Sequence, residues 1–138
     1  MNTQPLTPAE RAACAVCADW LATSPVLGLV AWFSVAAALA GLATGGAPHP
    51  VLLLVPLALA ERFLAVRVAL DARLFDRLAT GSIASLDDLD AGLQQTLSVP
   101  AAKAGRPLAP RIAGARRLYR WQLLATVLIA VLAILAWC

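Results

Sequence analysis

The chain has 138 residues, of which 61% are apolar and 14% are charged, and its net charge is +3. Soluble domains have roughly 45–50% apolar and about 25% charged residues. A domain of this length could not bury so much apolar surface, so the composition excludes an ordinary soluble domain and indicates one membrane domain. The small net charge argues against nucleic-acid binding.

The expected fold class is all-α. Only helices and closed β-barrels satisfy every backbone polar group inside a bilayer. Alternating strands of about ten residues, which are typical of a barrel, do not recur in this sequence. We therefore predict an integral membrane protein with three transmembrane helices, an N-terminal interfacial helix and a short cytoplasmic helix between spans two and three.

The first predicted element is an interfacial helix over residues 8–22. Thr7, Pro8 and Glu10 have the spacing of a capping box, with threonine at the N-cap, proline at the first helical position and glutamate at the third. The segment is rich in alanine, and an amphipathic leader of this kind would lie along the inner membrane surface.

Three apolar stretches satisfy the roughly 17–25 residues that a spanning helix needs. Span one lies within 25–43 and carries no charge, while span two lies at the start of a long helix over 50–79. Span three ends a helix over 110–138 that begins with basic residues. Between the last two helices, residues 81–109 form a cytoplasmic excursion with a short helix from Ser85 to about Leu97.

Two alternatives remain open for the spans. Span one could be a signal peptide, because Ala38-Leu39-Ala40 resembles a cleavage site, but the acidic residues Glu10 and Asp19 precede it and no basic cluster opens the chain. Span two could instead enter the membrane and bend along the interface after Ala60.

The topology follows from the positive charges. Lysine and arginine near span ends mark the cytoplasmic side. The connection 43–50 has neither residue, whereas the region 71–120 has seven arginines and one lysine, Lys103. We therefore expect a multi-pass protein of a bacterial inner membrane, with a cytoplasmic N-terminus and with Cys138 at the periplasmic face. Tyr119 and Trp121 would mark the inner boundary of span three.

Two charged residues, Glu61 and Arg62, interrupt span two. Ionised groups at that depth cost several kcal/mol unless they are paired or face protein. Adjacent helical residues point about 100° apart, so we expect Glu61 and Arg62 not to pair with each other. The nearest polar groups on the other spans are Ser34 and Gln122, with Thr126 deeper. This shortage favours a partner protein or a second copy over snorkelling to the interface or a transport role.

A charged face is predicted along the helix that begins with span two. Steps of 100° place five charged residues on one side with alanines between them. These residues are Glu61, Arg62, Arg73, Asp76 and Arg77. Arg67 and Asp71 form a separate i,i+4 pair away from this face.

A basic run precedes span three. It can act as a topology determinant, or its arginines can hold anionic lipid head groups or the neighbouring acids Asp71 and Asp76. The lipid head-group candidates are Arg111, Arg116, Arg117 and Arg120.

Cys14 and Cys17 have a C-x-x-C spacing on the first helix. A metal site needs three or four ligands, and Cys138 and His49 lie on the opposite side of the predicted membrane. We therefore expect the two cysteines to be structural, and we expect no bound metal, no cofactor and no catalytic residue.

Three functional hypotheses are consistent with these residues. The leading hypothesis is a small non-enzymatic accessory or assembly subunit that contacts the bilayer and a partner membrane protein, or its own copies, through the charged face. The alternative is a small transporter or proton-conducting component that uses Glu61. The second alternative is a metal-dependent lipid-modifying enzyme. Its candidate ligands would be Asp71, Asp76, Asp87 and Asp90, although their spacing departs from the regular four-residue intervals of enzymes that transfer CDP-linked alcohols.

Overall fold

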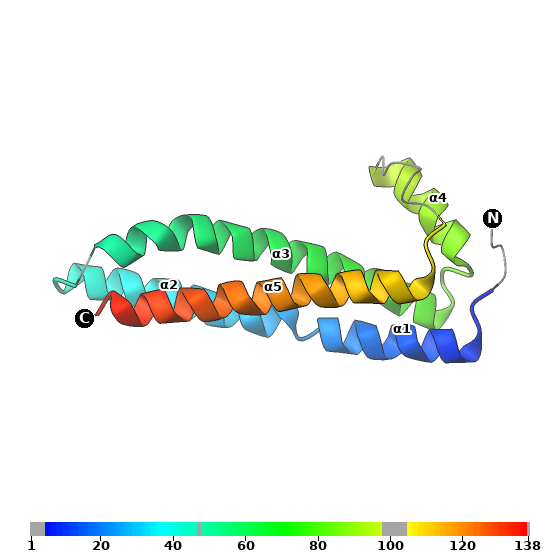
Figure 1. Ribbon diagram of the computed structural model, residues 1–138, viewed down its shortest axis with the longest axis horizontal. Coiled ribbons are helices and arrows are strands. Elements are labelled where there is room, and N and C mark those ends of the chain that lie inside the picture. Colours follow the sequence, from blue (N-terminus) through cyan, green and yellow to red (C-terminus); the bar gives the residue numbers. More distant parts are fainter. Residues whose placement is uncertain (1–4, 47, 98–104, 138) are drawn as a thin grey trace. The chain divides into compact units, whose positions relative to one another are not determined.

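The computed structural model describes residues 5–46, 48–97 and 105–137, and every regular element in these ranges is an α-helix (Figure 1). The expectation of an all-α fold is therefore confirmed. Lys103 and Cys138 lie outside the described residues, as do residues 98–104 of the predicted excursion 81–109.

The first helix begins at the predicted capping box. α1 spans Pro8–Leu21. The backbone N–H of Thr7 donates to Glu10 Oε2 at 2.9 Å, and the backbone N–H of Glu10 donates to Thr7 Oγ1 at 3.3 Å. These reciprocal bonds satisfy two donors that the helix start would leave unpaired. The hydrogen bonds from Thr7 hold the pKa of Glu10 below its usual value.

A short helix is also present between the second and third predicted spans, as the sequence predicts. α4 spans Leu86–Leu97. The Ser85 hydroxyl accepts the backbone N–H of Asp88 at 3.1 Å and donates to the Asp88 carboxylate at 2.7 Å. Serine can therefore begin this helix as its N-cap, because it pairs the exposed backbone donor of the first turn.

Three longer helices contain the predicted spans. They are α2 (Ser24–Ala43), α3 (His49–Thr80) and α5 (Leu108–Leu135). α3 continues as one helix through Ala60, and the alternative in which it turns along the membrane interface after that residue stays a prediction. It ends before Gly81, whose φ of +77° is a left-handed conformation that favours glycine.

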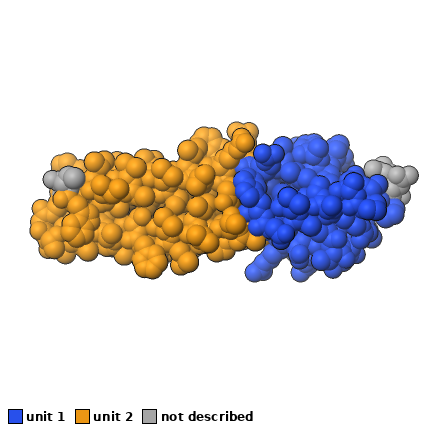
Figure 2. Space-filling view, turned by 90° about the horizontal axis from the view of Figure 1, so that it is seen from below, with its two compact units in different colours: residues 1–21, 70–116 blue, residues 22–69, 117–138 orange. Residues whose placement is uncertain are grey.

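The helices gather into two compact units (Figure 2). One, called here the charged unit, comprises residues 1–21 and 70–116, and the other, called here the apolar unit, comprises residues 22–69 and 117–138. Of the 19 charged residues, 11 basic and 8 acidic, 14 belong to the charged unit. The five in the apolar unit are Glu61, Arg62, Arg67, Arg117 and Arg120.

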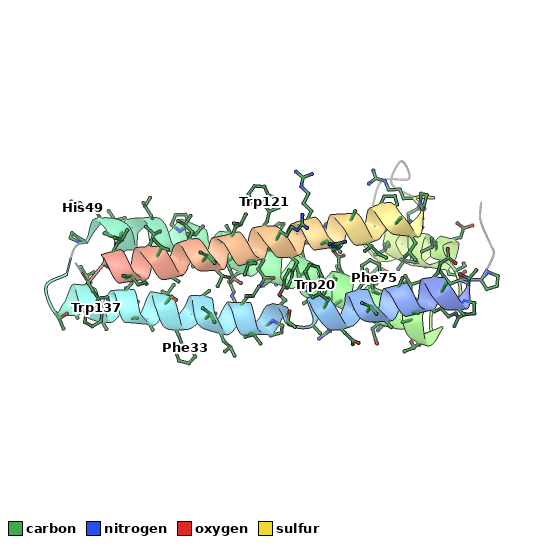
Figure 3. All side chains as sticks on the ribbon, turned by 60° about the horizontal axis from the view of Figure 1, so that its bottom comes forward. Trp20, Phe33, His49, Phe75, Trp121 and Trp137 are labelled. Atoms are coloured by element: carbon green, nitrogen blue, oxygen red, sulfur yellow. The ribbon has the colours of Figure 1, made fainter. Side chains whose placement is uncertain are left out.

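Large exposed apolar side chains show the opposite distribution and lie mostly in the apolar unit. Among the described residues, all large exposed apolar side chains except Val16, Trp20 and Leu70 belong to the apolar unit. Phe33, for example, is 74% exposed and points away from α2 (Figure 3). Soluble proteins rarely expose apolar surface on this scale.

The core of the apolar unit is built largely from small side chains. The buried cluster consists of Ala31, Ala38, Leu54, Ile129, Ala133 and Ala136. Small residues let helix backbones approach closely, which is how helices pack in a membrane, where apolar burial alone gives no advantage.

Two helical stretches of the described chain, Pro8–Ala43 and Leu108–Leu135, are long and apolar enough to cross a membrane. The first combines α1 with α2, and the second is α5. α3, which carries Glu61 and Arg62, is not among them, so the three-span topology stays a prediction.

Candidate functional site

Glu61 occupies a core position of α3. Within the apolar unit, Leu54, Glu61 and Val68 are all buried and follow one another at intervals of seven residues. Residues seven apart lie on nearly the same side of a helix. Glu61 therefore lies on the buried side of α3, at a position where an apolar side chain would be expected. Only 1% of Glu61 is exposed.

The buried carboxyl group is held by hydrogen bonds from another helix. Gln122 of α5 donates from Nε2 to Glu61 Oε1 at 3.0 Å and to the backbone oxygen of Ser24 at 3.2 Å. The Ser24 hydroxyl donates to Gln122 Oε1 at 2.7 Å. Both amide hydrogens and the amide oxygen of Gln122 are thus used, and the three helices α2, α3 and α5 are joined by one polar network.

The prediction that Glu61 and Arg62 do not pair with each other is wrong. Arg62 Nε lies 3.3 Å from Glu61 Oε2. The two Cα–Cβ bonds point about 100° apart, but the pair can form because the arginine side chain is long and folds back across α2. Its guanidinium lies 5.7 Å from the centre of the Trp32 ring, a cation–π arrangement.

Gly28 makes room for this arginine. A Cβ added at Gly28 would collide with Nη2 of Arg62. Gly28 and Trp32 lie one helical turn apart on α2, so the glycine provides the space and the tryptophan the ring face. The side chain of Arg62 remains 43% exposed, in contrast to the enclosed Glu61.

An apolar cavity of about 240 Å³ lies between α2 and α3, next to the ion pair. Its lining on α2 is apolar, whereas on α3 it runs from apolar residues to the charged pair. The lining residues are Ala31, Trp32, Val35, Leu54, Val55, Ala58, Leu59, Glu61 and Arg62.

Of the polar neighbours that the sequence predicted for Glu61, only Gln122 bonds to it. Ser34 donates to the backbone oxygen of Val30 in its own helix at 2.8 Å. Thr126 is buried, and its hydroxyl has no hydrogen-bond partner among the described residues. Ser24 was not among the predicted neighbours. Its place at the same end of the apolar unit as Gln122 could have revealed it.

The opposite end of the apolar unit is closed by Trp137 (Figure 3). The indole Nε1 donates to the backbone oxygen of Ala37 at 3.1 Å. The ring lies against Gly41, where a Cβ would approach it within 3.1 Å. This contact links the end of the chain's last helix to α2, while the ring remains largely exposed.

The predicted charged face does not hold together as one surface. Glu61 is buried, whereas Arg73, Asp76 and Arg77 are exposed, so Glu61 faces the interior and does not belong to an exposed face. Arg67 is exposed and Asp71 is half-buried. At about 100° per residue, Glu61 points more than about 90° away from Arg73 and Arg77 around the axis of α3. The predicted face was therefore so wide that it included both buried and exposed residues.

The predicted lipid head-group arginines have different surroundings. Arg111 bonds through Nη2 to both carboxylate oxygens of Asp90, each at 2.8 Å. The guanidinium of Arg116 lies 5.9 Å from the Trp20 ring centre. Arg117 and Arg120 are exposed. Arg111 is therefore occupied by an intramolecular ion pair, and Arg117 and Arg120 are the more accessible of the four.

The aspartates proposed for a metal-dependent enzyme do not form a cluster. Asp90 accepts bonds from Arg111 and from the backbone N–H of Gly105 at 2.7 Å. No group of three or more His, Cys, Asp or Glu side chains among the described residues could hold a metal ion.

Cys14 and Cys17 are buried in the charged unit as free thiols. Burial raises the pKa of both thiols. Because the thiolate is the reactive form, this environment disfavours nucleophilic or redox chemistry and agrees with a packing role.

The arrangement of side chains in the apolar unit is the main indication of function in this chain. Its most unusual arrangement is a buried carboxyl group, an amide and a half-exposed guanidinium within a unit whose surface is otherwise apolar. Comparison with protein-family models, curated proteins and solved structures finds no match.

Proposed function

We propose that this protein is a small non-enzymatic subunit of a bacterial inner membrane, which spans the bilayer with α2, α3 and α5 and docks onto a partner through its charged unit. The division between the two units is the observation that carries this proposal: one holds most of the charge, and the other holds nearly all the exposed large apolar side chains.

The polar network supports a span in α3 despite its charges. A carboxyl group in the membrane interior is costly unless it is paired or faces protein. Glu61 satisfies this condition within the chain, because Gln122 and Arg62 contact its two oxygens. A partner protein is therefore not needed to neutralise Glu61.

Charge asymmetry supports the orientation. Arg117 and Arg120 lie beside Tyr119 and Trp121 at one end of the apolar unit, as expected for a cytoplasmic boundary. The connection 43–50 at the other end has no lysine or arginine. In this orientation the N-terminus is cytoplasmic, α1 lies at the inner interface and the C-terminus is periplasmic.

We assign the docking surface to the part of α3 that belongs to the charged unit, and Glu61 is not part of it. Arg73, Asp76 and Arg77 are exposed there, and their side chains make no hydrogen bond or ion pair with any described residue. Charges of both signs on one helix suit recognition of a complementary partner, since such contacts set orientation and suppress wrong partners.

Size and crosslinking measurements test the docking role. The protein would be purified from its native membrane in mild detergent after crosslinking through a photoreactive residue at the exposed position 80 of the same helix. We expect a discrete adduct, either with a second copy or with one partner, which is lost when Arg73→Glu and Arg77→Glu are added to the labelled protein. Arg106→Glu is the matched control because Arg106 is exposed in the same unit. A strict monomer without adducts would contradict the proposal.

Proton or solute transport through Glu61 is the alternative. Its support is the buried carboxyl group together with the unpartnered Thr126 hydroxyl of the same unit. It requires a dye-detected flux in liposomes that Glu61→Gln abolishes. An equal flux in protein-free liposomes would exclude it.

A further inference from the structure

We propose that the cavity between α2 and α3 holds one acyl chain of an anionic phospholipid from the cytoplasmic leaflet, with the lipid phosphate bound by Arg62. This inference rests on the proposed membrane insertion and adds a ligand to the apolar unit. Its starting point is that Arg62 pairs with Glu61 yet remains partly exposed.

The cavity is polar at one end only. Along α3, the lining proceeds from Leu54 through Ala58 to Arg62, and along α2 from Val35 through Trp32 to Ala31. Arg62 on α3 and the neighbouring Ala31 and Trp32 on α2 are therefore the members nearest the proposed cytoplasmic boundary. The lining of α3 extends about 12 Å at 1.5 Å per residue. A charged head at one end and an apolar channel directed into the bilayer match the polarity of an inner-leaflet phospholipid.

Arg62 retains donors for a phosphate. Its Nε faces Glu61, and no described residue accepts a hydrogen bond from Nη1 or Nη2. Guanidinium groups bind phosphate with paired N–H donors. The Trp32 ring and the space at Gly28 fix the guanidinium beside the cavity, so less side-chain freedom is lost on binding than for an arginine in open solvent.

The site also explains why an apolar cavity can persist beside a charged pair. Helices in a membrane gain nothing from apolar burial against lipid tails, so a lipid chain can fill this space at little cost. The negative phosphate would complement Arg62, whereas a zwitterionic lipid would bring a second positive charge into the same region.

Native mass spectrometry of the full chain in mixed nanodiscs tests this inference. The probe is an equimolar mixture of phosphatidylglycerol and phosphatidylcholine with identical chains. We expect one retained lipid, with phosphatidylglycerol preferred about fivefold, which is the factor for roughly 1 kcal/mol per basic residue at an anionic surface. Arg62→Gln should abolish the preference, while Arg120→Gln, an exposed arginine outside the cavity, should leave it unchanged.

A second variant keeps the test independent of the folding of Arg62→Gln. Ala58→Leu fills the cavity and should remove the retained lipid of both kinds while the protein stays monodisperse. Equal retention of the two lipids, an identical response to Arg62→Gln and Arg120→Gln, or a second copy of the chain in place of the lipid would overturn the inference. Flotation of the same variants reconstituted into vesicles separates the two proposals, because a protein that floats with the vesicles but selects no lipid contradicts only this inference.

Discussion

The apolar unit and the charged unit use polar residues in opposite ways. In the apolar unit, Glu61 and Gln122 are enclosed, and each bonds across helices. In the charged unit, the bonds at Thr7 and Ser85 close local turns, and Arg73 and Arg77 are left exposed. A few enclosed polar groups therefore carry much of the specificity of the first unit, while the second combines local capping bonds with the Arg111–Asp90 ion pair.

The largest expected effect is at the centre of the apolar unit. Gln122→Leu keeps a similar volume but leaves Glu61 Oε1 and the Ser24 backbone oxygen without their donor. We expect the free energy of unfolding in mixed micelles to fall by roughly 2–3 kcal/mol, because unpaired buried polar groups are costly. Gln94→Leu, at an exposed position of α4, should change it by less than about 0.5 kcal/mol. Equal effects would remove the distinction between the two units.

Glycine replacements should have opposite signs in the two units. A Cβ at Gly46 of the apolar unit would collide with the backbone oxygen of Ala136, which cannot move away like a side chain. Gly46→Ala should therefore reduce the free energy of unfolding by about 1–2 kcal/mol. Gly114 in α5 of the charged unit has open space around it, so Gly114→Ala should raise stability by about 0.5–1 kcal/mol. Thermal unfolding of both variants would show whether the signs differ.

A smaller loss is expected for the ion pair of the charged unit. Asp90→Ala removes the acceptor of Arg111 and of the Gly105 N–H. We expect a loss of about 1 kcal/mol, since this pair is only partly shielded from solvent. Asp76→Ala, at an exposed aspartate, serves as the control. Limited proteolysis at increasing urea concentration measures the stability of this unit in both variants. Equal proteolysis of the two variants would contradict the role of the pair.

The smallest effect concerns the exposed capping box of α1. The lowered pKa of Glu10 means that its contribution to stability is present above the pKa of an unfolded glutamate and is lost as the pH falls through the folded value. Amide chemical shifts of α1 should show this step at acidic pH. Glu10→Gln should remove the step, and an unchanged titration in that variant would contradict the assignment.

Local features of the fold could be predicted from the sequence. The capping pairs at Thr7 and Ser85 and the glycine at position 81 mark helix boundaries because each acts within a few residues of chain. The apolar stretches likewise predicted α2 and the apolar half of α5. These signals need no knowledge of which helices meet.

The site could be predicted only in part. Gln122 was recognised as a polar neighbour of Glu61 because both lie in apolar stretches. The contribution of Ser24 depends on the register between helices, and the Arg62–Glu61 pair depends on the path of a long side chain across Gly28. Neither is encoded in the spacing of residues along one helix.

Accessibility of spin labels provides the most direct test of membrane insertion by the apolar unit. Single labels would be placed at Phe33 in the apolar unit and at Asp76 in the charged unit, both of which are exposed. In liposomes, we expect the label at position 33 to collide with oxygen and to be shielded from a water-soluble nickel chelate, and the label at position 76 to show the reverse. Equal access of the nickel chelate to both labels would contradict the account.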